Sequence, residues 1–329
     1  MTAELTVLAG DVGGSRTRLA LAAPGIGVTA LQSFSNDSFA SLEDVLQAYC
    51  AQPGLPPLQG ACLAVAGPVR GGAFQLSNRN WRGEASGIAA ALGLPEAGTM
   101  KLVNDLAALS QALPVLIPGQ LLSLRPGRQG GGQALVVGIG TGFNVSASLN
   151  GAALEAELGQ AGLPQLLCRR LQVLLEHAPE EFASIEALFS GPGLVRFHQA
   201  LTGAAASSAE GIEAAYLADP DTPEARTVCE WAHLLGLLAR ELTAAYMPGQ
   251  GLFFAGSVAR GILNTPARER FLNSYTAPGG RLGEVCAEVP LWLITDDAAG
   301  VSGAAQVALA AAGERLPASE DQARTGGRQ

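Results

Sequence analysis

The stretch LTVLAGDVGGSRTRLALA, residues 5–22, consists of two apolar segments on either side of a short glycine-rich segment. This pattern predicts two β-strands joined by a tight turn at Gly13 and Gly14. Paired glycines let a backbone approach a ligand closely, and successive N–H groups in such a turn form a concave anion site. Asp11, at the end of the first strand, is placed to hold a cation through water, so the stretch suits a magnesium nucleotide. An ordinary β-hairpin with a Gly-Gly turn would fit the same residues.

A second stretch, ALVVGIGTGFNVSA at residues 134–147, repeats this design. Again an apolar strand is followed by a glycine turn with a hydroxyl side chain and by another apolar strand. Two such hairpins far apart in one chain indicate an internal duplication, and together they could bind a triphosphate from both sides. Neither turn is a Walker A loop, because no Gly-Lys-Ser/Thr follows. Neither is a dinucleotide-binding turn, because each leads into a strand and not into a helix.

The composition narrows the class of protein. The chain has 329 residues, of which 48% are hydrophobic and 15% charged, and this favours about two globular domains. A net charge of −9 argues against a nucleic-acid partner and against an anionic membrane surface. The five cysteines are scattered without Cys-x-x-Cys spacing, which favours reduced thiols in the cytoplasm and no zinc site. The N-terminus lacks the basic region of a signal peptide.

Apolar runs of strand type alternate with helical patterns along the chain, which predicts an α/β fold. We expect helices over residues 106–113, 224–245 and 298–312, and a loop over residues 202–212. The Pro- and Gly-rich residues 114–132 mark the crossing from one domain to the next.

The segment around Asn104 and Asp105 is a candidate catalytic element. A short apolar strand leads into this polar pair, and a helix with an apolar face follows. A carboxylate at such a junction can reach a bound hydroxyl group. Asp105 also fits the simpler role of a helix cap, where the unpaired N–H groups of the first turn favour an acidic side chain.

Five segments occur in the order seen in bacterial glucokinases: DVGGS at residues 11–15, LVNDLAA at 102–108, GIGTG at 138–142, LFSGPGL at 188–194 and FFAG at 253–256. Over roughly residues 4–312 the chain resembles that family, which belongs to the hexokinase, actin and heat-shock ATPase superfamily. It lacks the cysteine-rich zinc motif of the related ROK sugar kinases.

The resemblance implies an enzyme that uses ATP and Mg²⁺ to phosphorylate glucose at its 6-hydroxyl. It implies a duplicated, two-lobed actin-like (ribonuclease H-like) α/β fold with an interlobe cleft. The lobes would be residues 1–113 with 300–315 and residues 114–299, followed by a disordered tail over 316–329. The lobes would close around the sugar and exclude water. A homodimer in the cytoplasm is the expected assembly.

The resemblance also assigns roles to residues. Asp105 would be the base that takes the proton of the 6-hydroxyl, and Asp11 would hold Mg²⁺ through water. The sugar would be bound by Asn78, Asn104, Asp105, Glu157, Gln160 and Glu186. The nucleotide would be bound by Asp11, Gly13, Gly14, Ser15, Gly140, Thr141, Gly142, Gly256 and Ser257. Asn78 also fits an ordinary turn residue, and both glutamates also fit solvated surface charges.

Five residues depart from the family pattern. Gln160 stands in place of a sugar-facing histidine, Ser257 in place of a glycine beside the adenosine, Arg16 in place of a hairpin asparagine, and Phe143-Asn144 in place of Leu-Gly. They leave sugar preference and nucleotide affinity open. A kinase for another hexose, such as mannose or an amino sugar, is the alternative. A non-catalytic sugar sensor is disfavoured because Asp105 and both hairpins are intact.

Overall fold

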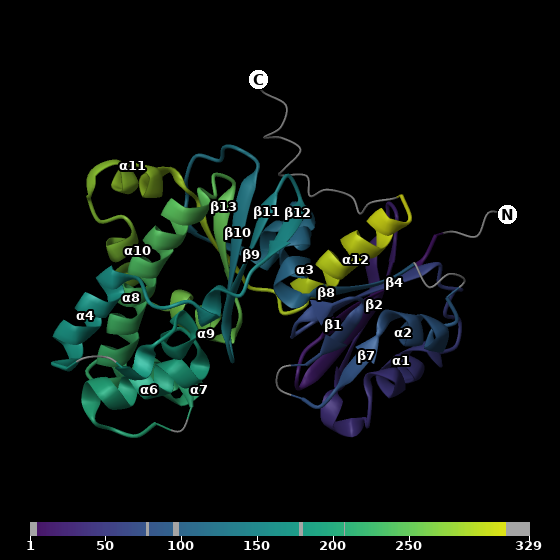
Figure 1. The fold of residues 1–329 in the computed structure, drawn as a ribbon, viewed down its shortest axis with the longest axis horizontal. Coiled ribbons are helices and arrows are strands. Elements are labelled where there is room, and N and C mark those ends of the chain that lie inside the picture. Colours follow the sequence, from purple (N-terminus) through teal and green to yellow (C-terminus); the bar gives the residue numbers. More distant parts are fainter. Residues whose placement is uncertain (1–4, 77–78, 95–98, 178–179, 207, 314–329) are drawn as a thin grey trace. The chain divides into compact units, whose positions relative to one another are not determined.

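A computed structural model describes residues 5–76, 79–94, 99–177, 180–206 and 208–313 (Figure 1). The described residues form two compact units. Unit 1 lies within Met1–Gln120, Gly151–Ala153 and Asp296–Gln329, and unit 2 within Leu121–Asn150 and Leu154–Thr295. The predicted sugar-binding residue Asn78 lies outside the described residues. In this part of the chain, no helix has both the length and the apolar character needed to cross a membrane.

Unit 1 is built on a five-stranded sheet in the order β3-β2-β1-β4-β8. Its strands are β1 (Val7–Val12), β2 (Arg16–Ala23), β3 (Gly27–Ser35), β4 (Gly60–Val65) and β8 (Met100–Asn104). The hairpin partners β1, β2 and β3 run antiparallel, whereas β1, β4 and β8 run parallel. Every residue of β4 is buried, as its apolar sequence predicts for a strand covered on both faces.

The helices of unit 1 are α1 (Leu42–Cys50), α2 (Ala85–Ala91), α3 (Asp105–Ala112) and α12 (Ala299–Ala311). Ser41 and Asp44 form a capping box at the start of α1, which satisfies two backbone amides of its first turn. Helix α12 comes from the far end of the chain and packs on β1, β4 and α3 (Figure 1). The contact with α3 is close, because a Cβ atom at Gly303 would overlap the carbonyl of Ala108.

A smaller antiparallel sheet also belongs to unit 1. It has the order β5-β6-β7, formed by β5 (Val69–Arg70), β6 (Ala73–Gln75) and β7 (Arg82–Glu84). Strands β6 and β7 are the two arms of a hairpin, closed at its tip by a hydrogen bond from the N–H of Leu76 to the carbonyl of Trp81 (2.9 Å).

Unit 2 is built on a six-stranded sheet in the order β12-β11-β10-β13-β14-β9. Its strands are β9 (Leu121–Arg125), β10 (Gln133–Ile139), β11 (Phe143–Leu149), β12 (Ala152–Glu155), β13 (Gly251–Ala255) and β14 (Leu291–Ile294). The glycine hairpin β10–β11 is antiparallel, and β10, β13 and β14 run parallel. Unit 1 has the same arrangement around β1, so the predicted duplication extends from the hairpins to the sheets.

The helices of unit 2 surround a large core. They are α4 (Gln165–Leu175), α5 (Ile185–Leu188), α6 (Gly191–Thr202), α7 (Ala209–Ala218), α8 (Pro223–Tyr246), α9 (Ser257–Leu263), α10 (Arg268–Tyr275) and α11 (Gly280–Glu288). The longest, α8, starts with Thr222 as N-cap and Pro223 in its first turn. Its Trp231 is fully buried and donates its indole N–H to the carbonyl of Leu188 (3.0 Å).

The predicted α/β class is confirmed, and the three predicted helices correspond to α3, α8 and α12 within one residue at each end. The predicted loop over residues 202–212 is wrong in its second half, because α7 begins at Ala209 with Ser208 as N-cap. Alanine and glycine dominate that stretch and conceal its amphipathic pattern. Only Ile212 and Tyr216 mark the buried face.

Candidate active site

Three strand ends meet at one edge of the unit 1 sheet. Strands β1, β4 and β8 are parallel, and their registers align Val12 with Val65 and Val65 with Asn104. The N–H of Ala66 donates to the carbonyl of Val12 (2.9 Å), which ties two of these ends together. In open α/β sheets, ligands bind beyond the carboxyl ends of the strands. The predicted residues of unit 1 that are described, Asp11, Gly13, Gly14, Ser15, Asn104 and Asp105, all lie at this edge.

Asn104 and Asp105 occupy the junction between β8 and α3. Asn104 is the N-cap residue, and its Oδ1 accepts from the N–H of Leu106 at 3.0 Å. Its Nδ2 donates to the carbonyl of Gly67 at 3.2 Å. Oδ1 of Asp105 accepts from the same Leu106 amide at 2.9 Å. Asn104 is therefore the residue that caps α3, and Asp105 is not required as the helix cap.

The pKa of Asp105 is raised to about 7: burial is the largest cause, the negative charge of Asp11 adds to it, and the Leu106 amide opposes the shift. A carboxyl with a pKa near neutral pH is suited to general base catalysis, because its ionised form is both populated and basic. Lys101, its basic neighbour in sequence, is exposed to solvent.

Asp11 forms an ion pair with Arg18 on the next strand. The distance from Nη1 of Arg18 to Oδ2 of Asp11 is 3.1 Å, and Nη2 of Arg18 lies 3.8 Å from Oδ2 of Asp297. Burial raises the pKa of Asp11, Arg18 lowers it, and Asp297 raises it slightly. On the other side of Asp11, a Cβ atom at Gly300 would lie 3.3 Å from its Cγ, so α12 also closes this position.

The backbone amides of the first glycine turn differ in their hydrogen bonds. The N–H of Gly13 already donates to the carbonyl of Arg16 at 2.9 Å, so it is occupied within the turn. The amides of Gly14 and Ser15 have no acceptor among the described residues. Of the three predicted nucleotide-binding positions here, these two offer free backbone donors.

The second glycine turn lies against two other predicted positions of unit 2. The N–H of Gly140 donates to the carbonyl of Gly142 (3.0 Å), which closes the turn around Thr141. A Cβ atom at Gly140 would lie 3.7 Å from Oγ of Ser257, the first residue of α9. Gly256 has φ +97°, and a Cβ atom there would overlap the carbonyl of Ile139, so this position requires glycine.

Glu186 lies beside the same turn. Its Oε2 accepts from the N–H of Phe143 at 2.9 Å, and its Oε1 accepts from Nε2 of Gln160 at 3.4 Å. Unit 2 therefore brings Gln160 and Glu186 together, as the resemblance implies. Gly142 leaves room for the carboxylate of Glu186, because a Cβ atom at position 142 would lie only 2.6 Å from its Oε2.

Asn144, which replaces a family glycine, holds the segment that carries Glu157. Its Oδ1 accepts from the N–H groups of Val145 (2.8 Å) and Leu158 (3.0 Å). Its Nδ2 donates to the carbonyl of Ala156 and lies 3.3 Å from Oε2 of Glu157. Glu157 is exposed, so its carboxylate is available to a ligand.

Sequence reasoning missed Arg18, Asn36 and Arg79. Arg18 stands in the first hairpin, two residues after Arg16, and strand alternation alone could have placed it on the face of Asp11. Asn36 and Arg79 are far from the turn in sequence but contact its carbonyls, and no local pattern marks such contacts.

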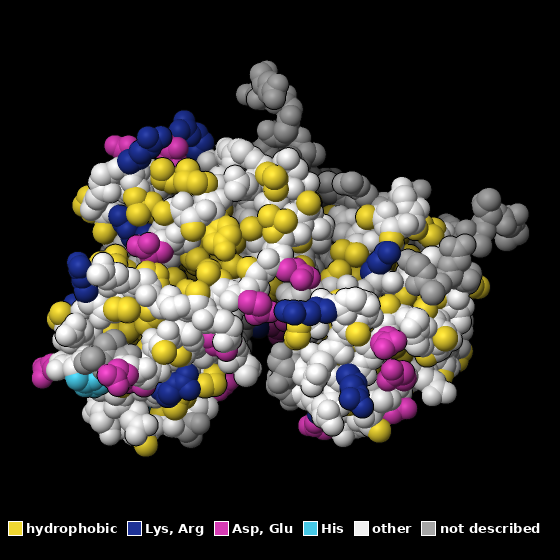
Figure 2. Space-filling view, viewed as in Figure 1, with side chains coloured by type: hydrophobic (Ala, Val, Ile, Leu, Met, Phe, Trp, Pro, Cys, Tyr) yellow, Lys and Arg dark blue, Asp and Glu magenta, His cyan; other side chains and the backbone are white. Residues whose placement is uncertain are grey.

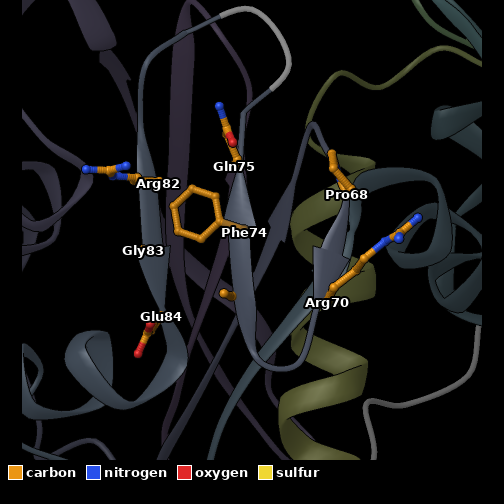
Figure 3. A pocket seen from close by; sticks show the side chains of 8 residues that line it. Pro68, Arg70, Phe74, Gln75, Arg82, Gly83 and Glu84 are labelled. Atoms are coloured by element: carbon orange, nitrogen blue, oxygen red, sulfur yellow. The ribbon is translucent and has the colours of Figure 1, made fainter.

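Two other surface features contain none of the predicted site residues. A pocket of about 590 Å³ on the three-stranded sheet is lined by Pro68, Arg70, Ala73, Phe74, Gln75, Arg82, Gly83 and Glu84. Figure 3 shows Arg70 and Arg82 pointing away from each other, so they do not converge on one ligand.

On the face shown in Figure 2, basic and acidic side chains are interspersed without a large basic patch. Within the described ranges, no three His, Cys, Asp or Glu side chains are grouped to hold a metal.

Comparisons with known proteins define the class. A solved glucokinase from an Antarctic psychrotroph superposes with a TM-score of 0.76 at 26% identity, covering 91% of this chain and 97% of that one. A ROK family glucokinase from Streptomyces griseus, solved with glucose and AMPPNP, shares the fold, with a TM-score of 0.62 at 18% identity over 92% and 98% of the two chains. The fold is therefore that of the actin-like ATPases, as predicted.

The profile of the family described as Glucokinase matches residues 8–311. The glucokinase of Nitrobacter hamburgensis is 30% identical over 319 residues, which cover 91% of this chain and 96% of that protein. The chain belongs to the glucokinase family, and this confirms the resemblance seen in its motifs. It is a phosphotransferase that uses ATP to phosphorylate glucose.

Proposed function

We propose that this chain transfers the γ-phosphoryl group of Mg²⁺-bound ATP to the 6-hydroxyl of glucose, with Asp105 as the general base. The observation that carries this assignment is the environment of Asp105. Its carboxyl lies beyond the end of β8, beside Asn104, and burial raises its pKa to about 7. A general base contributes typically about 10²- to 10⁴-fold to the rate when its pKa is close to the working pH.

In this proposal, the ionised carboxylate of Asp105 accepts the proton of the 6-hydroxyl. The sugar oxygen then forms a bond to the γ-phosphorus, and the bond from that phosphorus to the bridging oxygen of ADP breaks. Asn104 is held by its bonds to Gly67 and Leu106 and orients a second sugar hydroxyl. Little covalent chemistry falls to the protein, because phosphoryl transfer depends mainly on positioning and charge stabilisation.

Mg²⁺ would be held through water by Asp11. Mg²⁺ keeps several water ligands and is usually bound by one or two carboxylates together with substrate phosphates, so a site without three grouped protein ligands fits this ion. When bound, the ion would neutralise charge on the phosphates. Burial raises the pKa of Asp11, and Arg18 opposes this rise.

The remaining predicted residues supply ligand contacts. Glu157, Gln160 and Glu186 would bind sugar hydroxyls, since each carboxylate accepts several hydrogen bonds. The amides of Gly14 and Ser15 and the segments with Gly140, Thr141, Gly142, Gly256 and Ser257 would bind the nucleotide. The S. griseus structure with AMPPNP supports ATP as the donor.

Gln160 favours one second candidate, a kinase with broader hexose use. A glutamine cannot become charged near neutral pH as the histidine of the family pattern can. Recognition of the sugar would then depend more on Glu157 and Glu186, and mannose or an amino sugar could compete with glucose.

An ADP-release assay across a panel of hexoses tests the proposal. We expect glucose to be the preferred acceptor and Asp105→Asn to remove most of the activity. Preference for mannose or an amino sugar would favour the second candidate, and no turnover with any hexose would contradict both. The family resemblance also implies a cytoplasmic homodimer, and light scattering on the purified protein would test its assembly.

A further inference from the structure

The tip of the β6–β7 hairpin reaches the first glycine turn through Arg79. Its Nε donates to the carbonyl of Gly14 at 2.7 Å and its Nη1 to the carbonyl of Asn36 at 3.2 Å. Its Nη2 pairs with Asp37, and its Cζ lies 5.0 Å from the ring centroid of Trp81. These contacts hold a side chain that is only 22% exposed in one orientation.

Asn36 binds the same turn from a fully buried position. Its Nδ2 donates to the carbonyls of Gly13 (2.8 Å) and Gly14 (3.2 Å), and its backbone N–H donates to the carbonyl of Ser15 (2.9 Å). Its Oδ1 accepts from the hydroxyl of Thr17 at 2.8 Å, which fixes the orientation of the amide group. Three successive carbonyls of the turn are thus engaged by protein donors.

This engagement determines where the amides point. In a planar trans peptide, the carbonyl of one residue and the N–H of the next point in opposite directions. The bonds to the carbonyls of Gly13 and Gly14 therefore direct the amides of Gly14 and Ser15 away from Asn36 and Arg79. These are the two amides without an acceptor among the described residues, and adjacent outward N–H groups form an anion-binding concavity.

We propose that Arg79 is a positioning residue for ATP: it fixes the carbonyl side of the Gly13–Ser15 turn, so that the amides of Gly14 and Ser15 face a nucleotide phosphate. The inference rests on the proposed function and adds a residue 65 positions along the chain from Gly14. Arg79 makes the shorter bond to the carbonyl of Gly14, at 2.7 Å, whereas Nδ2 of Asn36 lies 3.2 Å from the same oxygen.

The chain offers a matched control in Arg82. This arginine belongs to the same hairpin, three residues after Arg79, but it is exposed, and Figure 3 shows its side chain directed out from β7. A general effect of removing one positive charge from the hairpin would appear in both arginines. A positioning effect would appear in Arg79 alone.

The experiment compares Arg79→Met, Arg79→Lys and Arg82→Met. The dissociation constant of the Mg²⁺ complex of AMPPNP is measured by calorimetry, and KM for ATP and for glucose by steady-state kinetics. We expect Arg79→Met to raise the dissociation constant and KM for ATP about tenfold, with KM for glucose changed less than about twofold, as for loss of bonds from a charged donor. Arg79→Lys should fall between, because an ammonium group cannot bond in two directions as a guanidinium fork does. Arg82→Met should match the wild type.

Unchanged AMPPNP affinity in Arg79→Met would overturn the proposal. So would a larger rise in KM for glucose than for ATP, which would assign Arg79 to the sugar through its neighbour Asn78. If Arg79→Met fails to fold in a thermal scan, Arg79→Lys gives the decision. Since AMPPNP binding needs no turnover, a wild type inactive on every hexose would contradict the proposed function while this inference could still be upheld or overturned.

Discussion

The negative charge of Asp11 raises the pKa of Asp105, adding to the larger effect of burial. Asp11 is the second-to-last residue of β1 and Asp105 directly follows β8, so both lie at the carboxyl ends of parallel strands at one edge of the unit 1 sheet. Asp11 is paired with Arg18, whereas the contacts of Asp105 come from a neutral amide. The two carboxyl groups therefore have different environments: Arg18 opposes the rise that burial causes in the pKa of Asp11, whereas a neutral amide contacts Asp105, whose pKa is raised to about 7.

The first prediction concerns pH. Only ionised Asp105 can accept a proton, so kcat/KM for glucose should fall about tenfold per pH unit below pH 7 and level off above it. Asp105→Asn should lower kcat by at least about 10²-fold and abolish this dependence. The measurement is the pH profile of initial rates for both proteins. Near-normal turnover in Asp105→Asn would remove Asp105 from the role of base.

The second prediction separates Asp11 from the sugar. Asp11→Asn should raise the Mg²⁺ concentration required for half-maximal rate and reduce turnover, because the ionised ligand for the hydrated ion is lost. Calorimetric binding of glucose should persist. Because one negative charge is removed, the acidic limb of the pH profile should also move to lower pH. Lost glucose affinity with an unchanged Mg²⁺ requirement would place Asp11 in the sugar site instead.

The third prediction concerns Ser257, which replaces a family glycine. A Cβ atom added to Gly140 would lie 3.7 Å from Oγ of Ser257. The Ser257 side chain is therefore beside the second glycine turn. Ser257→Gly should change KM for ATP and leave KM for glucose nearly unaltered. Steady-state kinetics with each substrate varied would show this. A change confined to glucose would mean that the start of α9 does not contact the nucleotide.

The fourth prediction concerns Glu213, a half-buried residue of α7 whose carboxylate lies against Gly261 of α9. The pKa of Glu213 is raised from 4.5 to about 7, mainly by burial and in smaller part by the charge of Glu210. The folded state thus favours the protonated acid. Its stabilising contribution is complete below pH 4.5, decreases as pH rises toward 7, and is lost above that value.

Glu213→Gln should therefore raise Tm relative to the wild type at pH 8, by about 2 °C or more, and the difference should shrink toward pH 5. Thermal unfolding at both pH values would measure it. Glu210→Gln serves as the partner variant. It should raise Tm by a smaller amount, because it removes only the charge repulsion between Glu210 and Glu213. A Glu213→Gln protein less stable than the wild type at pH 8 would contradict the raised pKa.

The sequence was sufficient for the parts of the fold that rest on local pattern. The runs before Gly13 and Gly140 are apolar because their strands are buried, and the polar pair at Asn104 follows the short apolar pair Leu102-Val103, so all three strand ends are visible in the sequence. The α/β class and the helices α3, α8 and α12 follow from the same periodicities. Their predicted bounds differ from the structure by only one residue at each end. Residues that mark helix ends, such as the N-cap Thr222, are local features of the sequence.

Contacts that depend on distant parts of the chain could not be predicted. Nothing near Gly14 indicates that Arg79 holds its carbonyl, and nothing near Asp105 shows that Asp11 shifts its pKa. The helices α9, α10 and α11 were also missed, since they are short and their stability comes from packing more than from their own sequence.

The last prediction concerns Gln160, the departure from the family pattern that bears most on sugar recognition. Its Nε2 lies 3.4 Å from Oε1 of Glu186, whose Oε2 is held by the amide of Phe143 at 2.9 Å. Gln160 therefore helps to orient a carboxylate proposed to bind the sugar, and it remains exposed enough to contact the sugar itself.

Gln160→Ala should raise KM for glucose roughly tenfold, about the loss of one hydrogen bond, and Gln160→His should preserve or improve the use of glucose. Glucose should remain preferred over 2-deoxyglucose, because a site built to bond a hydroxyl rejects an analogue that lacks it. Gln172→Ala, a change at an exposed glutamine on α4, is the matched control and should leave KM unaltered. Steady-state kinetics of the three variants on both sugars would decide the matter. If KM for glucose is unchanged in both Gln160 variants, Gln160 is only a surface residue, and sugar recognition falls to Asn104, Asp105, Glu157 and Glu186.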